Sequence, residues 1–179
     1  FLLPLFVEKM KITSQPGMGK FCFFHGNLSV PENENAVIFI VQELAAKMDH
    51  KFVIAGKNPT SAVRKVCRRD NVKLIANPAD SQLDQLLKDA QINIIPIFNN
   101  TGIKVKLVHS LFKGRFVLTT SSIMGGGGLD ELCTLARTAD DFRNAVINLM
   151  NKEFPDTEIL KRKNFLETYF DPEANAQKL

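Results

Sequence analysis

The chain has 179 residues, of which 45% are hydrophobic and 23% are charged, and its formal net charge is +4 at pH 7. This composition is typical of one globular domain with its own core, and no apolar run approaches the ~20 residues that a membrane-spanning helix needs. The small positive charge favours anionic ligands without requiring nucleic acid. Three cysteines without a C-x-x-C spacing and three separated histidines predict no metal site and a reducing compartment, so we expect a cytoplasmic protein.

Strand-like and helix-like segments alternate along the chain with short connections. Buried strands are expected at 21–26, 51–56, 71–76, 92–98, 116–120 and 132–136. Helices are expected at 31–48, 60–70, 79–90, 103–113 and 140–151, with one or two more after Pro155. The alternation predicts an α/β, three-layer Rossmann-like domain, which is an open parallel sheet of about six strands with helices on both faces. Residues 1–19 end in SQPGMGK and are expected to be a linker or extension, so that 20–179 form the domain.

The segment 92–120 contains the clearest functional signal. It reads as a buried strand, a polar turn at 99–102, a helix and a second strand, which together form a β-α-β unit. The turn lies at the carboxyl end of its first strand, where open α/β sheets bind ligands. Thr101 and Gly102 precede the helix, and backbone amides at that point favour an anion such as a phosphate ester. A plain N-cap and turn is the alternative for this pair.

Three residues of the same helix, Lys106, His109 and Lys113, are spaced i, i+3 and i+7 and therefore share one face. If that face lines the ligand cleft, Lys106 contacts a phosphate and His109 a ribose; the alternative is a solvated basic face. Lys104 opposes the helix dipole near the helix start, which an anion would offset. Lys113 lies beside the helix stop at Gly114, so we interpret it as structural.

Polar residues also follow the first three expected strands. Gly26 and Asn27 end the first strand, Lys57 and Asn58 follow the second, and Asn77 ends the third; Ser29 then reads as the N-cap of the next helix. Because the carboxyl ends of parallel strands meet at one edge, these residues are candidate ligand contacts. Lys57 offers a charge to a phosphate, whereas turn chemistry is the alternative for Asn77.

Other motifs carry less functional information. The four glycines at 125–128 lack the Gly-x-x-x-x-Gly-Lys-Ser/Thr pattern, so we interpret them as a loop at the cleft mouth. Asp130 and Glu131 behind them are interpreted as the start of a helix rather than as sugar ligands. The first strand is not followed by Gly-x-Gly-x-x-Gly, which argues against a dinucleotide oxidoreductase. Mostly buried phenylalanines argue against a nucleic-acid-binding platform.

The order of these signals resembles the C-terminal, donor-binding half of group 1 glycosyltransferases of the GT-B fold. The matching pieces are FHGNLSVPENENA, VIAGKNP, VKLIANP and GIKVKLVHSLFKGRFVLTT. In the last piece the family usually reads Gly-x-x-x-Lys-x-x-Glu-Ala-x-x-x-Gly-x-Pro-Val, and Gly102, Lys106 and Gly114 match it. Thr101 and His109 stand where the family usually has acidic residues. A neutral imidazole accepts one hydrogen bond where a carboxylate accepts two, so ribose binding is expected to differ.

The resemblance implies a domain that binds a nucleoside diphosphate sugar without a metal or other cofactor. A missing N-terminal domain would hold a glycan or lipid-linked acceptor, giving a hexosyltransferase of polysaccharide biosynthesis that is inactive as an isolated domain. Donor contacts are then expected at Gly26, Asn27, Lys57, Asn58, Asn77, Thr101, Gly102, Lys104, Lys106 and His109. The changes at Thr101 and His109 motivate an alternative, a non-catalytic nucleotide-sugar-binding or assembly module. No nucleic acid is expected as a partner. Peripheral membrane contact by the full-length protein stays open. So do the identity of the donor, the identity of the acceptor and the stereochemistry of transfer.

Overall fold

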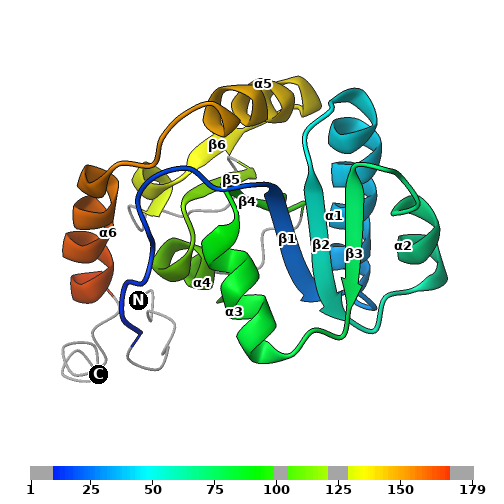
Figure 1. Cartoon of the computed structure of the whole chain (residues 1–179), viewed down its shortest axis with the longest axis horizontal. Coiled ribbons are helices and arrows are strands. Elements are labelled where there is room, and N and C mark those ends of the chain that lie inside the picture. The colour runs from blue at the N-terminus through cyan, green and yellow to red at the C-terminus, as the bar shows by residue number, and fades with distance from the viewer. Residues whose placement is uncertain (1–9, 99–104, 121–128, 170–179) are drawn as a thin grey trace.

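The computed structural model describes residues 10–98, 105–120 and 129–169, which form an α/β domain around one parallel sheet (Figure 1). The strands are β1 (Cys22–Asn27), β2 (Phe52–Lys57), β3 (Val72–Ala76), β4 (Ile92–Ile95), β5 (Phe116–Thr120) and β6 (Thr134–Ala136). Their order in the sheet is β3-β2-β1-β4-β5-β6, and all neighbouring strands are parallel. The order runs outward from β1 in one direction and from β4 in the other, which is the doubly wound arrangement.

Helices cover both faces of this sheet (Figure 1). They are α1 (Pro31–Phe39), α2 (Ser61–Val66), α3 (Asp80–Asp89), α4 (Val105–Lys113), α5 (Ala139–Met150) and α6 (Asp156–Tyr169). Side chains of α1, α2 and α5 share one core with strand residues such as Phe24 and Ile54. Strand residues that point the other way, such as Phe23 and Val117, pack with α3 and α4. Because alternate residues of a strand face opposite sides, continuously apolar strands need a helical layer on each face. The three-layer prediction is confirmed.

The observed elements follow the expected order, but several have different bounds. β4 ends at Ile95 rather than at Phe98, and the helix that begins at Pro31 changes after Phe39 into a π-helix and then a 3-10 helix. The expectation that Ser29 is the N-cap is wrong, because Val30 occupies that position. The hydroxyl of Ser29 instead donates to Oδ1 of Asn27 at 2.9 Å. The side chain of Ser29 therefore bonds within the turn after β1 and does not cap the start of α1.

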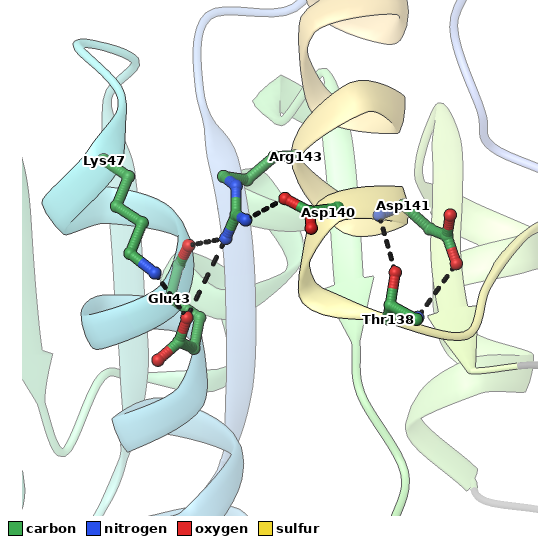
Figure 2. A network of polar contacts seen from close by, with 6 residues as sticks. All are labelled: Glu43, Lys47, Thr138, Asp140, Asp141 and Arg143. Carbon is green, nitrogen blue, oxygen red and sulfur yellow. Dashed lines mark hydrogen bonds and ion pairs between the residues drawn. The ribbon is translucent and has the colours of Figure 1, made fainter.

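An arginine on α5 ties that helix to the π-helix Ile40–Leu44 (Figure 2). The guanidinium of Arg143 donates to the backbone carbonyl of Glu43 at 2.9 Å and pairs with the carboxylate of Asp140. Lys47 pairs with Glu43 at 2.7 Å. Surface ion pairs of this kind add little free energy. The bond to the Glu43 carbonyl matters more, because it gives a backbone group of the irregular turn a partner from the neighbouring helix.

The segment 10–19 and α6 lie together at one end of the domain (Figure 1). The backbone N–H of Thr13 donates to the carbonyl of Phe112 at 2.8 Å, and that of Gly17 donates to the carbonyl of Phe154 at 2.9 Å. The described part of the segment is therefore bonded to α4 and to the chain just before α6. Its connection to another domain stays a prediction. Within the described residues, no helix combines the length and the apolar character needed to cross a membrane.

The pairing between β1 and β4 ends early. β1 pairs with β2 along six residues, but it pairs with β4 only at Cys22–Ile92 and Phe23–Asn93. The carboxyl halves of β1 and β4 are therefore not joined by ladder hydrogen bonds. Helices α1 and α4 leave from this edge on opposite faces of the sheet. This is the switch point at which doubly wound sheets bind their ligands.

Candidate functional site

The carboxyl edge of the sheet gathers the candidate residues that the structure describes. They come from the ends of β1, β2 and β3 and from α4, and they are Gly26, Asn27, Lys57, Asn58, Asn77, Lys106 and His109. The register of the sheet sets Asn27 directly beside Lys57. Three further candidates, Thr101, Gly102 and Lys104, lie outside the described residues, as do the glycines at 125–128. The edge is therefore described from β3 to α4 without the loop that leads into α4.

Lys106, in the first turn of α4, reaches across the switch point to α1. Its Nζ donates to Oδ1 of Asn33 at 2.7 Å and lies 4.8 Å from the ring centre of Phe24 on β1. Since α1 and α4 cover opposite faces of the sheet, the ammonium lies at the edge between them. The side chain is partly buried.

Asn33 connects this lysine to the end of β1. Its Nδ2 donates to the carbonyl of Asn27 at 2.9 Å, while its Oδ1 accepts from Lys106. A Cβ at position 26 would lie 2.9 Å from Asn33 Nδ2, so Gly26 leaves room for this amide. A Cβ on Gly56, the partner of Gly26 in β2, would meet the Gly26 carbonyl oxygen. The glycine considered as a ligand contact therefore also has a packing role.

Asn58 and Asn77 share one turn structure after β2 and β3. Both have a positive φ, of 51° and 52°, a region that asparagine tolerates better than most residues. The N–H of Asn58 donates to Oδ1 of Asn77 at 2.9 Å, and the N–H of Asn77 donates to the carbonyl of Gly56 at 2.8 Å. The two residues thus fix the shape of neighbouring turns at the edge. A donor contact from either stays a prediction.

Lys57 is a second lysine at this edge. Its side chain is exposed, and no ion pair to it occurs within the described part of the chain. Its carbonyl accepts from the N–H of Leu28 at 2.7 Å, which holds the turn after β1 next to β2. The lysine is therefore placed on a fixed backbone, but its phosphate contact is untested.

His25, near the end of β1, lies among the charged residues of α4. Its Nε2 is buried and has no hydrogen-bond partner in the described structure. The pKa of His25 is lowered to about 4, chiefly by burial. The charges of Lys106, His109 and Lys113 lower this pKa as well, whereas Asp84 on α3 raises it. The imidazole is therefore neutral at pH 7.

The charged face of α4 turns toward β1 and α3. Burial, and next the charge of Lys113, lower the pKa of the half-buried His109, and Asp84 opposes the shift. Lys113 pairs with Asp84 at 2.7 Å, so it has a structural role, although the expectation rested on the helix stop and not on this pair. Lys106, His109 and Lys113 are all partly buried, and the ligand contacts expected of Lys106 and His109 stay predictions.

Sequence reasoning missed His25 and Asn33 as parts of this edge. Asn33 and Lys106 are 73 residues apart in the chain, so only folding shows their contact. The available signal was position, because Asn33 lies in the first turn of the helix that follows the first strand, where ligands of such sheets bind. His25 lies in an apolar strand with no partner pattern around it, and we see no sequence signal that marks it.

The sequence predicts no metal site for this chain. Within residues 10–98, 105–120 and 129–169, no group of three or more His, Cys, Asp or Glu side chains is arranged to hold a metal ion. The cysteines Cys22, Cys67 and Cys133 are free. Asp130 and Glu131 lie in a short 3-10 helix, Leu129–Leu132, and burial raises the pKa of Asp130.

Comparison with known proteins supports the architecture. No family model matches the chain. An uncharacterized 44.6 kDa protein in the cps region of Klebsiella pneumoniae is 28% identical over 138 residues, which cover 70% of this chain and 36% of that protein. The chain therefore spans little more than a third of the length of this relative.

Several solved structures share the fold. Sucrose-phosphate synthase from Thermosynechococcus elongatus matches with a TM-score of 0.66 at 14% identity, over 89% of this chain and 43% of that one. The UDP-forming α,α-trehalose-phosphate synthase from Burkholderia xenovorans, in complex with glucose-6-phosphate, matches at 0.60 and 12%, over 85% and 40%. The C-terminal domain of a glycosyl transferase group 1 family protein from Francisella tularensis matches at 0.54 and 13%, over 86% and 84%. These similarities confirm the expected resemblance at the level of the fold.

Proposed function

We propose that this chain, which has the fold of the C-terminal domain of GT-B glycosyltransferases, binds a nucleoside diphosphate sugar at the carboxyl edge between β1 and β4. The observation that carries the proposal is the position of Lys106. Its ammonium bonds to Asn33 of α1 at the switch point, and Asn33 in turn bonds to the carbonyl at the end of β1. A cation at this edge of the sheet favours an anionic ligand such as a diphosphate.

The chemistry follows from where charge develops. As a sugar leaves its nucleoside diphosphate, negative charge grows on the departing diphosphate. Lys106 and Lys57, with Lys104 and the amides that precede α4, would neutralise this charge, each charge-assisted hydrogen bond being worth about 1.5–3 kcal/mol. The proposed catalysis is therefore positioning together with electrostatic stabilisation, and it requires no metal or other cofactor.

The nucleoside would lie over the turns after β2 and β3 and against α4. The proposed base contact is Asn77, with Asn58 held beside it. His109 would contact the ribose. Because its pKa is lowered, the imidazole is neutral at pH 7 and accepts a single hydrogen bond. Ribose binding should therefore be weaker than with a carboxylate at that position.

The rest of the proposed reaction depends on a second domain. This chain spans 36% of its curated relative and 40–43% of the two synthases, which supports an N-terminal domain that binds a glycan or lipid-linked acceptor. The name of the Klebsiella relative, in the cps region, is our reason for proposing polysaccharide biosynthesis. The free cysteines favour a reducing, cytoplasmic location.

A second candidate function is a non-catalytic module that binds a nucleotide sugar or mediates assembly. The half-buried, neutral His109 favours it, since a carboxylate that accepts both ribose hydroxyls is replaced. Both candidates bind the nucleotide sugar at the same site, but only the enzyme turns it over. An assay of donor hydrolysis or sugar transfer, made on a protein that contains this chain and the proposed N-terminal domain, distinguishes them.

Calorimetric titration of the chain with UDP, GDP and uridine tests the proposed site. We expect either diphosphate to bind at least tenfold more tightly than uridine, because one charge-assisted contact alone is worth about that factor. Equal affinity for UDP and uridine would show that the lysines are not phosphate contacts. Absence of binding at millimolar nucleotide would overturn the proposed function.

A further inference from the structure

The net charge of the chain is concentrated in ten residues. The segment 64–73, RKVCRRDNVK, contains five basic residues and one acidic residue, a net charge of +4. The other 169 residues contain 18 basic and 18 acidic side chains and are neutral in sum. This segment plays no part in the proposed donor site. The basic patch is formed by Arg64, Lys65, Arg68, Arg69 and Lys73.

The fold keeps the whole patch on the surface at one end of the domain. Arg64 and Lys65 belong to α2, the next two arginines follow it, and Lys73 lies on the edge strand β3. All five side chains are exposed. Figure 1 shows α2 and β3 at the end of the domain opposite to α6.

The charges of the patch are not neutralised within the described chain. None of the five side chains forms an ion pair or a hydrogen bond with another described residue, and the exposed Asp70 pairs with none of them. Lys73 also protects an edge strand against pairing with another sheet. Arg64 and Lys65 lie in the last turn of α2, where the helix dipole favours cations, so Arg68 and Arg69 are left without such a local role.

We propose that the basic patch binds the surface of a bilayer that contains anionic phospholipid. Such a surface attracts clustered Lys and Arg side chains without requiring shape complementarity, and each residue near it strengthens binding about fivefold. Nucleic acid fits the patch less well. The segment 64–73 has no aromatic residue for base stacking, and α2, with six residues, is too short to lie along a groove as a recognition helix. The proposal goes beyond donor binding and would orient the domain at the membrane.

Sedimentation of the chain with phospholipid vesicles tests this proposal. One set of vesicles is pure phosphatidylcholine, and the other contains about one-third phosphatidylglycerol, so that the two differ in surface charge. We expect binding only to the anionic vesicles and loss of binding at about 1 M salt, where the screening length is short. The variant with Arg64→Gln, Arg68→Gln and Arg69→Gln should partition about 100-fold more weakly.

A charge-matched control separates the patch from the net charge. The variant with Lys11→Gln, Lys20→Gln and Lys163→Gln removes three exposed charges elsewhere and should bind almost as well as the parent. Melting curves establish that both variants fold. No binding of the parent to anionic vesicles, or equal losses in the two variants, overturns the proposal. Binding to duplex DNA or RNA without binding to vesicles would assign the patch to nucleic acid instead.

Discussion

The two ends of α4 hold buried or partly buried cations in opposite ways. At its carboxyl end, the guanidinium of Arg162 from α6, only 1% exposed, donates to the carbonyls of Leu111, Gly114 and Arg115. Those carbonyls lack partners in the helix itself, and a cation is favourable at that end of the dipole. At the amino end, Lys106 is held where the dipole opposes it. The charge of Arg162 therefore stabilises the fold, whereas we propose that the charge of Lys106 binds a ligand.

Arg162 and His25, which lie against α4, also differ in their contacts and in their charge at pH 7. The Arg162 guanidinium packs 4.8 Å from the ring of Phe154, and burial lowers its pKa only to about 10, so it stays charged at pH 7. His25 stacks on Phe23 with 5.7 Å between ring centres, but its Nε2 has no partner in the described structure. Each side chain leaves one buried nitrogen without a partner, Nε of Arg162 and Nε2 of His25, but Arg162 also donates to three backbone carbonyls. The carboxyl end should therefore be the more sensitive to mutation in stability, and the amino end in ligand binding.

The largest expected effect is the loss of the arginine at the carboxyl end. Arg162→Ala leaves three backbone carbonyls without their charged donor, so the free energy of unfolding should fall by about 3–5 kcal/mol. Urea denaturation measures it as a lower midpoint. Lys163→Ala, an exposed neighbour on the same helix, is the control and should change the stability by less than about 0.5 kcal/mol. Similar midpoints for both variants would mean that the buried network does not hold α6 to α4.

The pH dependence of stability tests the amino end. His25 has a folded pKa of about 4, below its ordinary value of 6.5. The unfolded chain therefore takes up this proton first, and stability is lost as pH falls from 6.5 toward 4, by up to about 3 kcal/mol. His25→Phe keeps the stacking on Phe23 but cannot be protonated. Unfolding curves at several pH values should show that the variant lacks this part of the acid destabilisation; parallel profiles would show that His25 does not titrate as described.

The charge of Lys106 should affect binding more than folding. Lys106→Ala removes a charge-assisted contact with phosphate, so UDP binding should weaken by about 1.5–3 kcal/mol, with little change for uridine. Lys113→Ala removes the same charge from the same helix and serves as the control, because Lys113 pairs with Asp84. Calorimetry with both ligands compares the variants. Equal losses of UDP affinity in the two variants would mean that Lys106 acts only through the net positive charge of the helix and not through a contact with phosphate.

The smallest expected effect concerns ribose recognition at His109. His109→Glu restores an acceptor of two hydrogen bonds beside Lys106 and Lys113, so it should strengthen UDP binding by about 1 kcal/mol and 2′-deoxy-UDP less. His109→Gln is the control for the change of shape, since it carries no charge. Unchanged selectivity between ribose and deoxyribose in the Glu variant, with a normal melting curve, would remove His109 from the proposed ribose site.

Local sequence patterns determined the layers of this protein and their order. Short apolar runs separated by amphipathic segments specify buried parallel strands and covering helices, because each face of each strand needs an apolar partner. At the start of α5, Thr138 and Asp141 form a capping box from residues three apart, a local pattern that the expectation of a helix from residue 140 did not use. The spacing of Lys106, His109 and Lys113 likewise placed them on one helix face.

Tertiary structure alone decided how that face is used and what surrounds it. Asn33 contacts Lys106 only when α1 and α4, which cover opposite faces of the sheet, are both in place. Asp84 contacts Lys113 only when α3 and α4 are packed together. The sequence suggested Ser29 as a helix cap, but its hydroxyl bonds to Asn27 in the folded turn. Strand and helix types depend on the periodicity of neighbouring residues, whereas burial, pKa and polar partners depend on residues far apart in the chain. The sequence therefore determined the sheet and the edge that carries the candidate site, and the fold decided which charges there are paired and which are buried.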